Sequence, residues 1–430
     1  MSAPAETRDE GLLRAIGPAG LTASVVNAVV GGGIFALPAA IALELGPSGP
    51  LAFVLGGILI GLVTASIASV GGRVAQSGGT WAYAEAAFGP FAGYLTGVLF
   101  LLTSVLASAS LAAGLVDSVS GLDPMLARPE MRVAELVLLY AVLVGVNLRG
   151  VRAGTGVISG LAVIKFLALL LFVVLGVSVV RAENFVVREL PTAAHVGRST
   201  ILALFALCGM ETALGASGEV RDPVRTIPRA LFAATVLVVL TYLAIQVVAQ
   251  GVLGSELASA TAPLADSVAR VSPVWKSVIL GAGAVSMAGW LVGDLLGTSR
   301  MVFAFGRMGV LPRFLTIVHE KRRVPYWAVV CYATIAFVLA MFGTFTTLAV
   351  LSSVGTILLY LSCCGAACAL QERRIVPLLA IAALLAMLFS CTSAELLSIG
   401  AVMAAAGVWY WMTSRWRRAA RMTDPGKRSP

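Results

Sequence analysis

Long apolar segments alternate with short polar ones along almost the whole chain. Twelve apolar segments can be drawn, each between 17 and 30 residues long. A helix needs about 20 residues to cross the hydrocarbon core of a bilayer. The pattern therefore predicts an all-α polytopic membrane protein with twelve transmembrane helices. The segments are residues 21–45, 50–71, 88–117, 133–149, 156–180, 198–218, 229–252, 275–304, 325–343, 346–369, 375–391 and 394–413.

Three consecutive glycines, Gly31, Gly32 and Gly33, interrupt the first apolar segment. Each lowers helix propensity by about 1 kcal/mol relative to alanine. Within hydrocarbon, the backbone groups freed by a break must meet another helix, water, an ion or a ligand. The alternative role of such residues is to let two helices pack closely. We favour a binding loop, because three adjacent glycines pack no better than one and destroy the helix.

A second interruption, at Cys208-Gly209-Met210-Glu211, lies in the sixth apolar segment. Two interrupted membrane helices in corresponding halves indicate a binding site near the bilayer midplane. The starts of the two interrupted segments are offset by five, an odd number, so the second unit is inverted relative to the first, which predicts a five-plus-five repeat with two helices appended. The predicted division is a cytoplasmic tail (1–17), a first repeat (18–180), a second repeat (181–370), helices 11 and 12 (371–413) and a basic cytoplasmic tail (414–430).

Composition and charge agree with this pattern. The chain is 59% hydrophobic and only 12% charged, with a mean hydropathy of +0.96, whereas soluble domains carry about 25% charged residues. The net charge of +9 does not indicate nucleic acid, because the basic residues gather in alternate loops. With the N-terminus in the cytoplasm, 22 of 30 basic residues lie inside and seven outside. The positive-inside rule then places both termini in the cytoplasm of a protein of the inner (cytoplasmic) membrane.

Residues for enzymatic or metal chemistry are sparse. The six cysteines lie in or beside apolar segments and form no pair with a matching histidine, which indicates buried thiols. The two histidines, His195 and His319, fall in loops on opposite sides, and no HExxH or GxSxG motif occurs. We therefore expect no metal site, no cofactor and no enzymatic activity.

Four stretches of the chain resemble the amino acid–polyamine–organocation (APC) family of amino acid permeases, which have the LeuT-type fold. Two departures stand out: Gly32 occupies a position that is often Ser or Thr in the family, and Asp294 has no counterpart in the pattern. The resemblance covers residues 15 to 370 and does not specify a substrate. The stretches are Gly31-Gly32-Gly33-Ile34-Phe35 with Pro38, residues 77–83 with 88–93, Gly209 and Glu211 with residues 219–230, and Ser299-Arg300 with Gly309, Leu311 and Pro312.

The resemblance and the breaks together imply a backbone site for an amino acid. Free N–H groups at the glycine triplet would bind the α-carboxylate at the start of the following half-helix. Carbonyls of Ala28, Val29 and Val30 would face the ammonium group. Carbonyls of Phe205, Ala206 and Leu207, next to Gly209, would complete its binding from the second break. The family places an aromatic gate near here, for which Phe205 is the candidate; a packed core ring is the alternative.

Three ionisable side chains lie inside the apolar segments, where such groups are costly and mark functional sites. Glu211 either binds substrate or protons, or stabilises the unwound backbone. Lys165 resembles a lysine whose amine replaces a sodium ion in sodium-independent family members, with Ser299 as an expected neighbour; a purely structural ammonium is the alternative. Asp294 either pairs with a cationic substrate or with Lys165, or faces a water-filled cavity.

The sequence thus predicts a secondary active transporter that moves amino acids through the lipid bilayer by alternating access. Coupling to protons without sodium is expected from Lys165. A neutral amino acid is favoured because small residues such as Thr103, Ser104 and Ser108 suggest a roomy, mostly apolar pocket. An exporter or exchanger, a carrier of cationic amino acids or polyamines, and a receptor that binds without transport remain alternatives. The protein is expected to be a monomer or a homodimer.

Overall fold

The computed structural model describes residues 16–71, 79–120, 125, 128–149, 165–213, 220–319, 322 and 324–423. Several predicted features lie outside this part: most of the N-terminal tail, residues 77 and 78, residues 156–164 of the fifth apolar segment, Glu219, and the last seven residues of the basic tail. The regular secondary structure of the described residues is helical apart from one isolated bridge between Ile16 and Val220. The predicted all-α class is confirmed, and seven to eight candidate membrane spans agree with a polytopic membrane protein.

Proline sets the start of many helices. Seven of them have proline as their first residue, where its missing N–H costs nothing and its fixed φ suits a helix. The helices are α1 (Pro18–Val29), α2 (Gly33–Leu45), α3 (Pro50–Gly71), α4 (Thr80–Phe88), α5 (Pro90–Ser120), α6 (Pro129–Leu148), the helix Lys165–Val179, α8 (Ala193–Leu207), α9 (Met210–Ala213), α10 (Pro223–Leu253), α11 (Pro263–Ala269), α12 (Pro273–Arg307), α13 (Tyr326–Phe342), α14 (Phe345–Leu370), α15 (Ile375–Leu388) and α16 (Ser393–Thr423).

In the described part, seven helices are long and apolar enough to cross a membrane alone, and the bent pair of α1 and α2 makes an eighth candidate. Four further apolar helices are shorter: Lys165–Val179, α8, α13 and α15. Each of the twelve apolar segments contains one of these helices or the bent pair. Two helices were not predicted, α4 and α11, because with nine and seven residues they are too short to stand out as apolar segments.

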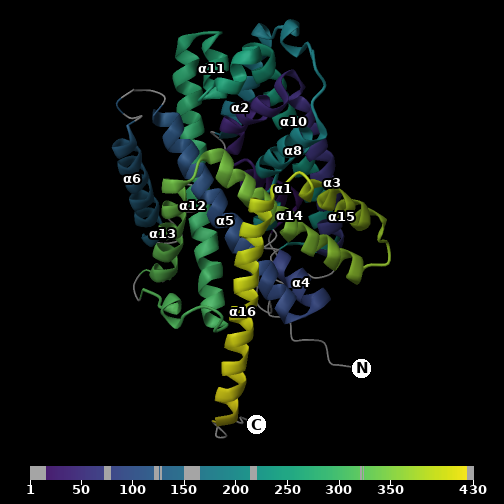
Figure 1. Cartoon of the computed structure of the whole chain (residues 1–430), viewed down its shortest axis with the longest axis vertical. Helices are drawn as coiled ribbons and strands as arrows, with labels where there is room; N and C mark the ends of the chain where they lie inside the picture. The colour runs from purple at the N-terminus through teal and green to yellow at the C-terminus, as the bar shows by residue number, and fades with distance from the viewer. Residues whose placement is uncertain are drawn as a thin grey trace.

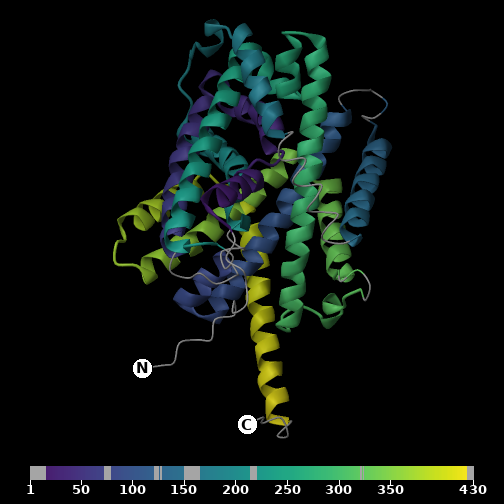
Figure 2. The same cartoon turned by 180° about the vertical axis from the view of Figure 1, so that it is seen from behind.

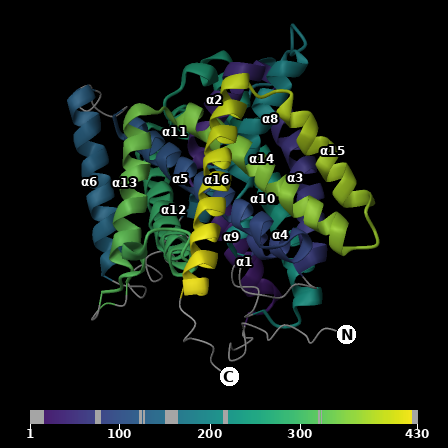
Figure 3. The same ribbon diagram turned by 60° about the horizontal axis from the view of Figure 1, so that its bottom comes forward.

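The interrupted helices α1, α2 and α8 lie inside the bundle (Figure 1), where α3, α10 and α14 pack against them. Helices α1 and α9, which are far apart in sequence, pack side by side (Figure 3). Helix α6 lies at the edge next to α13 in both opposite views (Figure 2). Helix α16 is mostly exposed and runs to Thr423, so part of the predicted basic tail continues the last helix.

Candidate functional site

The glycine triplet breaks the first membrane helix. Helix α1 ends at Val29, α2 begins at Gly33, and their axes are bent by 52°. The glycines are also needed for packing against α12. A Cβ on Gly31 would lie 2.9 Å from a ring carbon of Trp290, and one on Gly32 would lie 2.0 Å from Cγ of Met287. The triplet therefore serves both as a break and as a close contact.

Most carbonyls freed by this break are already bonded to side chains from other helices. The bonds run from Lys165 Nζ to Asn27 O (2.7 Å), from Trp290 Nε1 to Ala28 O (3.2 Å), from Tyr242 Oη to Val29 O (3.3 Å) and from Ser286 Oγ to Gly31 O (2.6 Å). Of the three carbonyls expected to face an ammonium group, only that of Val30 has no recorded hydrogen bond within the described chain.

The backbone N–H groups on the other side of the break make fewer hydrogen bonds than the carbonyls do. The N–H groups of Gly32, Gly33 and Ile34 make no recorded hydrogen bond to any described residue, whereas Phe35 N donates to Gly32 O at 3.0 Å. These amides form the first turn of α2, where the helix dipole favours negative charge. The arrangement suits a carboxylate.

The second break lies directly against the first. Helix α8 ends at Leu207, Cys208 is extended, and Gly209 has a φ of 118°. A side chain would be strained at this φ, and a Cβ on Gly209 would come within 3.0 Å of Ala28 O. Glycine is therefore required at this point, where the two interrupted helices touch.

Glu211 holds the second break in place. One of its carboxylate oxygens, Oε2, accepts hydrogen bonds from Gly209 N (3.1 Å) and from Tyr360 Oη on α14 (2.8 Å). The side chain is buried, yet it lines the cavity described next. It can therefore stabilise the unwound backbone and face a ligand at once.

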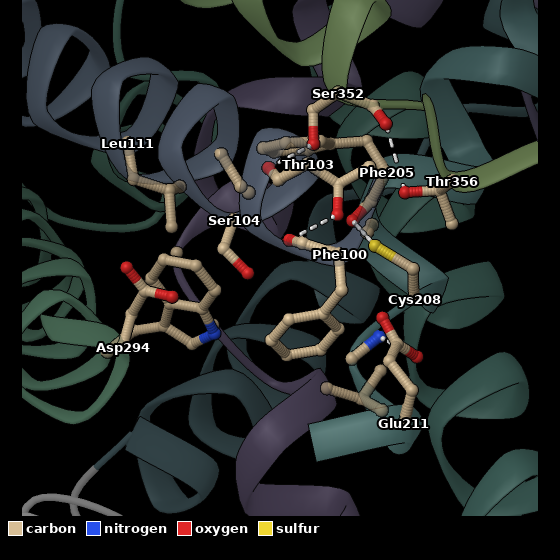
Figure 4. Close-up of a pocket in the computed structure, with 18 residues that line it drawn as sticks. Phe100, Thr103, Ser104, Leu111, Phe205, Cys208, Glu211, Asp294, Ser352 and Thr356 are labelled. Atoms are coloured by element: carbon tan, nitrogen blue, oxygen red, sulfur yellow. Dashed lines mark hydrogen bonds between the residues drawn. The ribbon is translucent and has the colours of Figure 1, made fainter. Parts of the chain in front are cut away.

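A cavity lies between the two breaks and helices α5, α12 and α14. About 50 Å³ is open to the centres of water-sized molecules, enough for three or four waters at about 15 Å³ each. Asp294 and Glu211 lie on opposite sides of it, with Phe100 and Ser104 between them (Figure 4). Its polar side chains are Thr103, Ser104, Cys208, Glu211, Asp294, Ser352 and Thr356, besides the indole of Trp290.

Comparison with known proteins identifies the family to which the chain belongs. The family model described as "Amino acid permease" matches residues 16–423. The chain belongs to this family. It is thus an integral multi-pass membrane protein, an amino acid permease of the APC type, and not an enzyme.

Relatives of the permease carry related descriptions. An uncharacterized transporter of Mycobacterium tuberculosis (strain ATCC 25618 / H37Rv) is 27% identical over 448 residues, covering 99% of this chain and 98% of that protein. The vacuolar cationic amino acid transporter 2 of Arabidopsis thaliana is 26% identical, covering 84% of this chain and 60% of that protein. The vacuolar cationic amino acid transporter 4 of the same plant is 24% identical, covering 83% and 63%.

The permease brings most residues expected at the site to one cavity. The predicted residues that line the cavity are Val29, Gly31, Gly32, Gly33, Phe205, Ala206, Gly209, Glu211 and Asp294. The predicted residues that do not line it are Ala28, Val30, Leu207, Lys165 and Ser299. Sequence reasoning missed Trp290, which lies one helical turn from Asp294 on α12. That spacing of four residues was the available signal, because it places both side chains on one helix face.

Lys165 lies behind the first break and is 5% exposed. Its ammonium group donates to Asn27 O at the end of α1. Ser299 is fully buried and donates to Leu296 O within its own helix (3.3 Å), with no recorded bond to Lys165. The possible pairing of Lys165 with Asp294 is also absent, since no described carboxylate forms an ion pair with this lysine.

Phe205 covers one side of the cavity. Its ring lies against the first break, since a Cβ on Gly33 would be 3.0 Å from the Phe205 ring. It also meets Phe345 of α14 edge to face, with ring centroids 5.9 Å apart. The ring thus both packs and faces the cavity. Within the described residues, no cluster of three or more His, Cys, Asp or Glu side chains could hold a metal ion.

Proposed function

We propose that this permease is a secondary transporter that moves amino acids across the cytoplasmic membrane by alternating access, coupled to protons and independent of sodium. The observation that carries the proposal is the meeting of two helix breaks at one cavity. One break offers unbonded N–H groups, and the other offers carbonyls and a carboxylate. An amino acid carries the complementary pair of charges, a carboxylate for the N–H groups and an ammonium group for the carbonyls and the carboxylate.

For the architecture, we propose that all twelve apolar helices cross the bilayer as a five-plus-five inverted repeat with two further helices. The position of the two breaks supports this, since they fall in the first and sixth apolar segments. Both termini would then be cytoplasmic, as the distribution of basic residues indicates. The repeats would be residues 18–180 and 181–370.

Within the cavity, the α-carboxylate would bind the N–H groups of Gly32, Gly33 and Ile34. The ammonium group would lie near the carbonyl of Ala206 and the carboxylate of Glu211, which line the cavity. The carbonyls of Val30 and Leu207, which do not line it, would contribute only after the two breaks rearrange. The small volume of the cavity favours a substrate with a short side chain. Lys165 would provide, at Asn27 O, the fixed positive charge that a sodium ion supplies in related transporters.

A cationic amino acid is the second candidate substrate. Asp294 lines the cavity and could bind a basic side chain, and two of the relatives are described as cationic amino acid transporters. A larger cavity in another state of the cycle would be needed to hold such a side chain.

The test is counterflow in proteoliposomes, after a thermal-stability screen of the purified protein against amino acids and polyamines. A ligand at 100 times its Kd stabilises a protein by about 2.7 kcal/mol. We expect exchange of a small neutral amino acid with choline replacing sodium. Ligand stabilisation without any flux would identify a receptor instead, and failure of all ligands to bind would refute the proposal.

Replacement of Phe205 by alanine should weaken substrate affinity by about tenfold, equivalent to about 1.4 kcal/mol. The reason is that the ring closes one side of the cavity and would lose its contacts with the bound substrate. The measurement is Kd from ligand-induced thermal shifts, with Phe342→Ala on an exposed end of α13 as the matched control. Equal affinity in the two variants would show that Phe205 only packs against Phe345.

Cys208 offers a direct probe of the cavity, because its side chain lines it and is not fully buried. A small methanethiosulfonate reagent should inhibit counterflow, and substrate should protect against the inhibition. The Cys208→Ser variant should show the same counterflow rate with and without the reagent. Inhibition of the variant to the same extent as wild type would mean that another thiol, or another site, is responsible.

A further inference from the structure

Asp294 is a carboxylate that faces the cavity without a cation. Its Oδ2 accepts a hydrogen bond from Tyr332 Oη on α13 (2.6 Å), and its Oδ1 accepts one from Thr298 Oγ1 one turn along α12 (3.1 Å). With Glu211 it is one of two carboxylates that line the cavity, and no lysine, arginine or histidine lines it. The side chain is half-buried, and an ionised carboxylate that loses its access to water without gaining a counter-charge is costly.

Behind Asp294, helix α6 presents a polar face to the protein interior. Tyr140 and Asn147 lie seven residues apart on this helix and are 6% and 1% exposed. Tyr140 Oη and Asn147 Oδ1 have no hydrogen-bond partner among the described residues. Ser108 of α5 is close to both Tyr140 and Asp294. Buried polar atoms of this kind normally bind internal water.

The titratable groups that face Asp294 are few. Helix α13 contributes Tyr332 and α6 contributes Tyr140; α5 contributes only the hydroxyl groups of Ser104 and Ser108. On α12 itself, Arg300 donates to Leu296 O. Lys165 is bonded to Asn27 O, away from the cavity lining. No described cation therefore competes with a proton for this carboxylate.

We propose that Asp294 takes up the coupled proton, so that each cycle carries one proton on this carboxylate together with a neutral amino acid. The inference rests on the proposed transport function and names its coupling site. When the cavity closes, the substrate ammonium group compensates the charge of Glu211, and the glycine amides compensate the charge of the substrate carboxylate. Asp294 alone would keep an uncompensated charge. A proton from water on one side neutralises it, and the reverse transfer to water on the other side completes the cycle.

A basic side chain of the substrate is the other possible source of this positive charge. The cavity has room for three or four waters and must widen for any amino acid, and it must widen further for a lysine or arginine side chain than for a small neutral substrate with a proton. In this proposal, a proton would reach the carboxylate through internal water bound near Tyr332, Thr298 and the unpartnered oxygens of α6. In this assignment, Lys165 is a positioning residue for α1, and Asp294 is the proton-binding residue.

The experiment measures uptake KM against pH, proton-driven accumulation and counterflow in proteoliposomes containing the full chain. In the wild type, KM should fall by up to tenfold for each unit of acidification while one linked proton binds. In Asp294→Asn, KM should be independent of pH and proton-driven accumulation should be lost, while counterflow at equal pH persists. The matched control is Asp117→Asn near the C-terminal end of α5, where the side chain is exposed; it makes the same chemical change and should keep the wild-type pH response.

Two results would overturn the inference: an Asp294→Asn variant with the wild-type pH response, or one that selectively loses lysine, arginine or polyamines. If this variant does not fold, Tyr332→Phe serves instead. It removes a hydrogen bond to the ionised carboxylate, so the midpoint of the KM profile should move to higher pH, and an unchanged midpoint refutes the inference. A wild type without counterflow would refute the transport function itself, which separates the two failures.

Discussion

Replacement of Gly32 by leucine should abolish substrate binding and transport, with a loss of at least 100-fold, while the protein still inserts in the membrane. A Cβ at this position would lie 2.0 Å from Met287 Cγ and 3.0 Å from Met287 Cα. A rotamer change of Met287 would move Cγ but not Cα, which is a backbone atom of α12. The contact with the backbone would therefore remain. Overpacking of this kind costs about 1–3 kcal/mol or more, and the branched side chain would also fill the space next to the free amides.

The measurement is ligand-induced thermal stabilisation together with counterflow, after size-exclusion chromatography has shown that the variant is intact. The matched control is Gly281→Leu on α12, where a Cβ would meet nothing within 4 Å. A double variant, Gly32→Ala with Met287→Ala, should recover more affinity than Gly32→Ala alone, because the closest contact is removed. Normal substrate affinity in Gly32→Leu would show that the glycine break is not the binding site.

Replacement of Lys165 by alanine should eliminate sodium-independent uptake, again by at least 100-fold. The ammonium group donates to Asn27 O at 2.7 Å and is the group that joins the helix Lys165–Val179 to the end of α1. Without it, a carbonyl freed by the break loses its partner, which costs about 1–3 kcal/mol, and the fixed positive charge beside the break disappears. The break should then no longer hold the geometry needed for binding.

The test compares proton-gradient-driven uptake and counterflow in sodium and in choline for wild type and variant. Lys276→Ala provides the matched control, since this lysine is exposed and pairs with Asp266 at the surface. Strict sodium dependence of the wild type would contradict the role given to Lys165. Full, pH-sensitive transport by Lys165→Ala would leave the fold and the cavity in place but remove this residue from the mechanism.

Much of the architecture follows from local properties of the chain. Apolar length marks all twelve helical segments, proline at a first position marks where many helices start, and the glycines at 31–33 and 209 mark both breaks. These features depend on residues close together in sequence, because helix propensity and backbone freedom are local. The likeness to amino acid permeases could be read from the same motifs, and the family match confirms it.

The contacts that make the breaks into a site depend on tertiary packing. Ser286 and Trp290 reach the carbonyls of Gly31 and Ala28 across more than 250 residues of sequence, and no local pattern reveals such a partner. The same holds for Lys165, which bonds Asn27 O rather than Ser299, and for Asp294, whose partners are Tyr332 and Thr298 rather than a lysine. The sequence alone determined where the backbone is broken. The packing of α12 and its neighbours decided which freed groups are satisfied and which stay open to a ligand, because a backbone group inside a membrane bonds whatever the fold brings within reach.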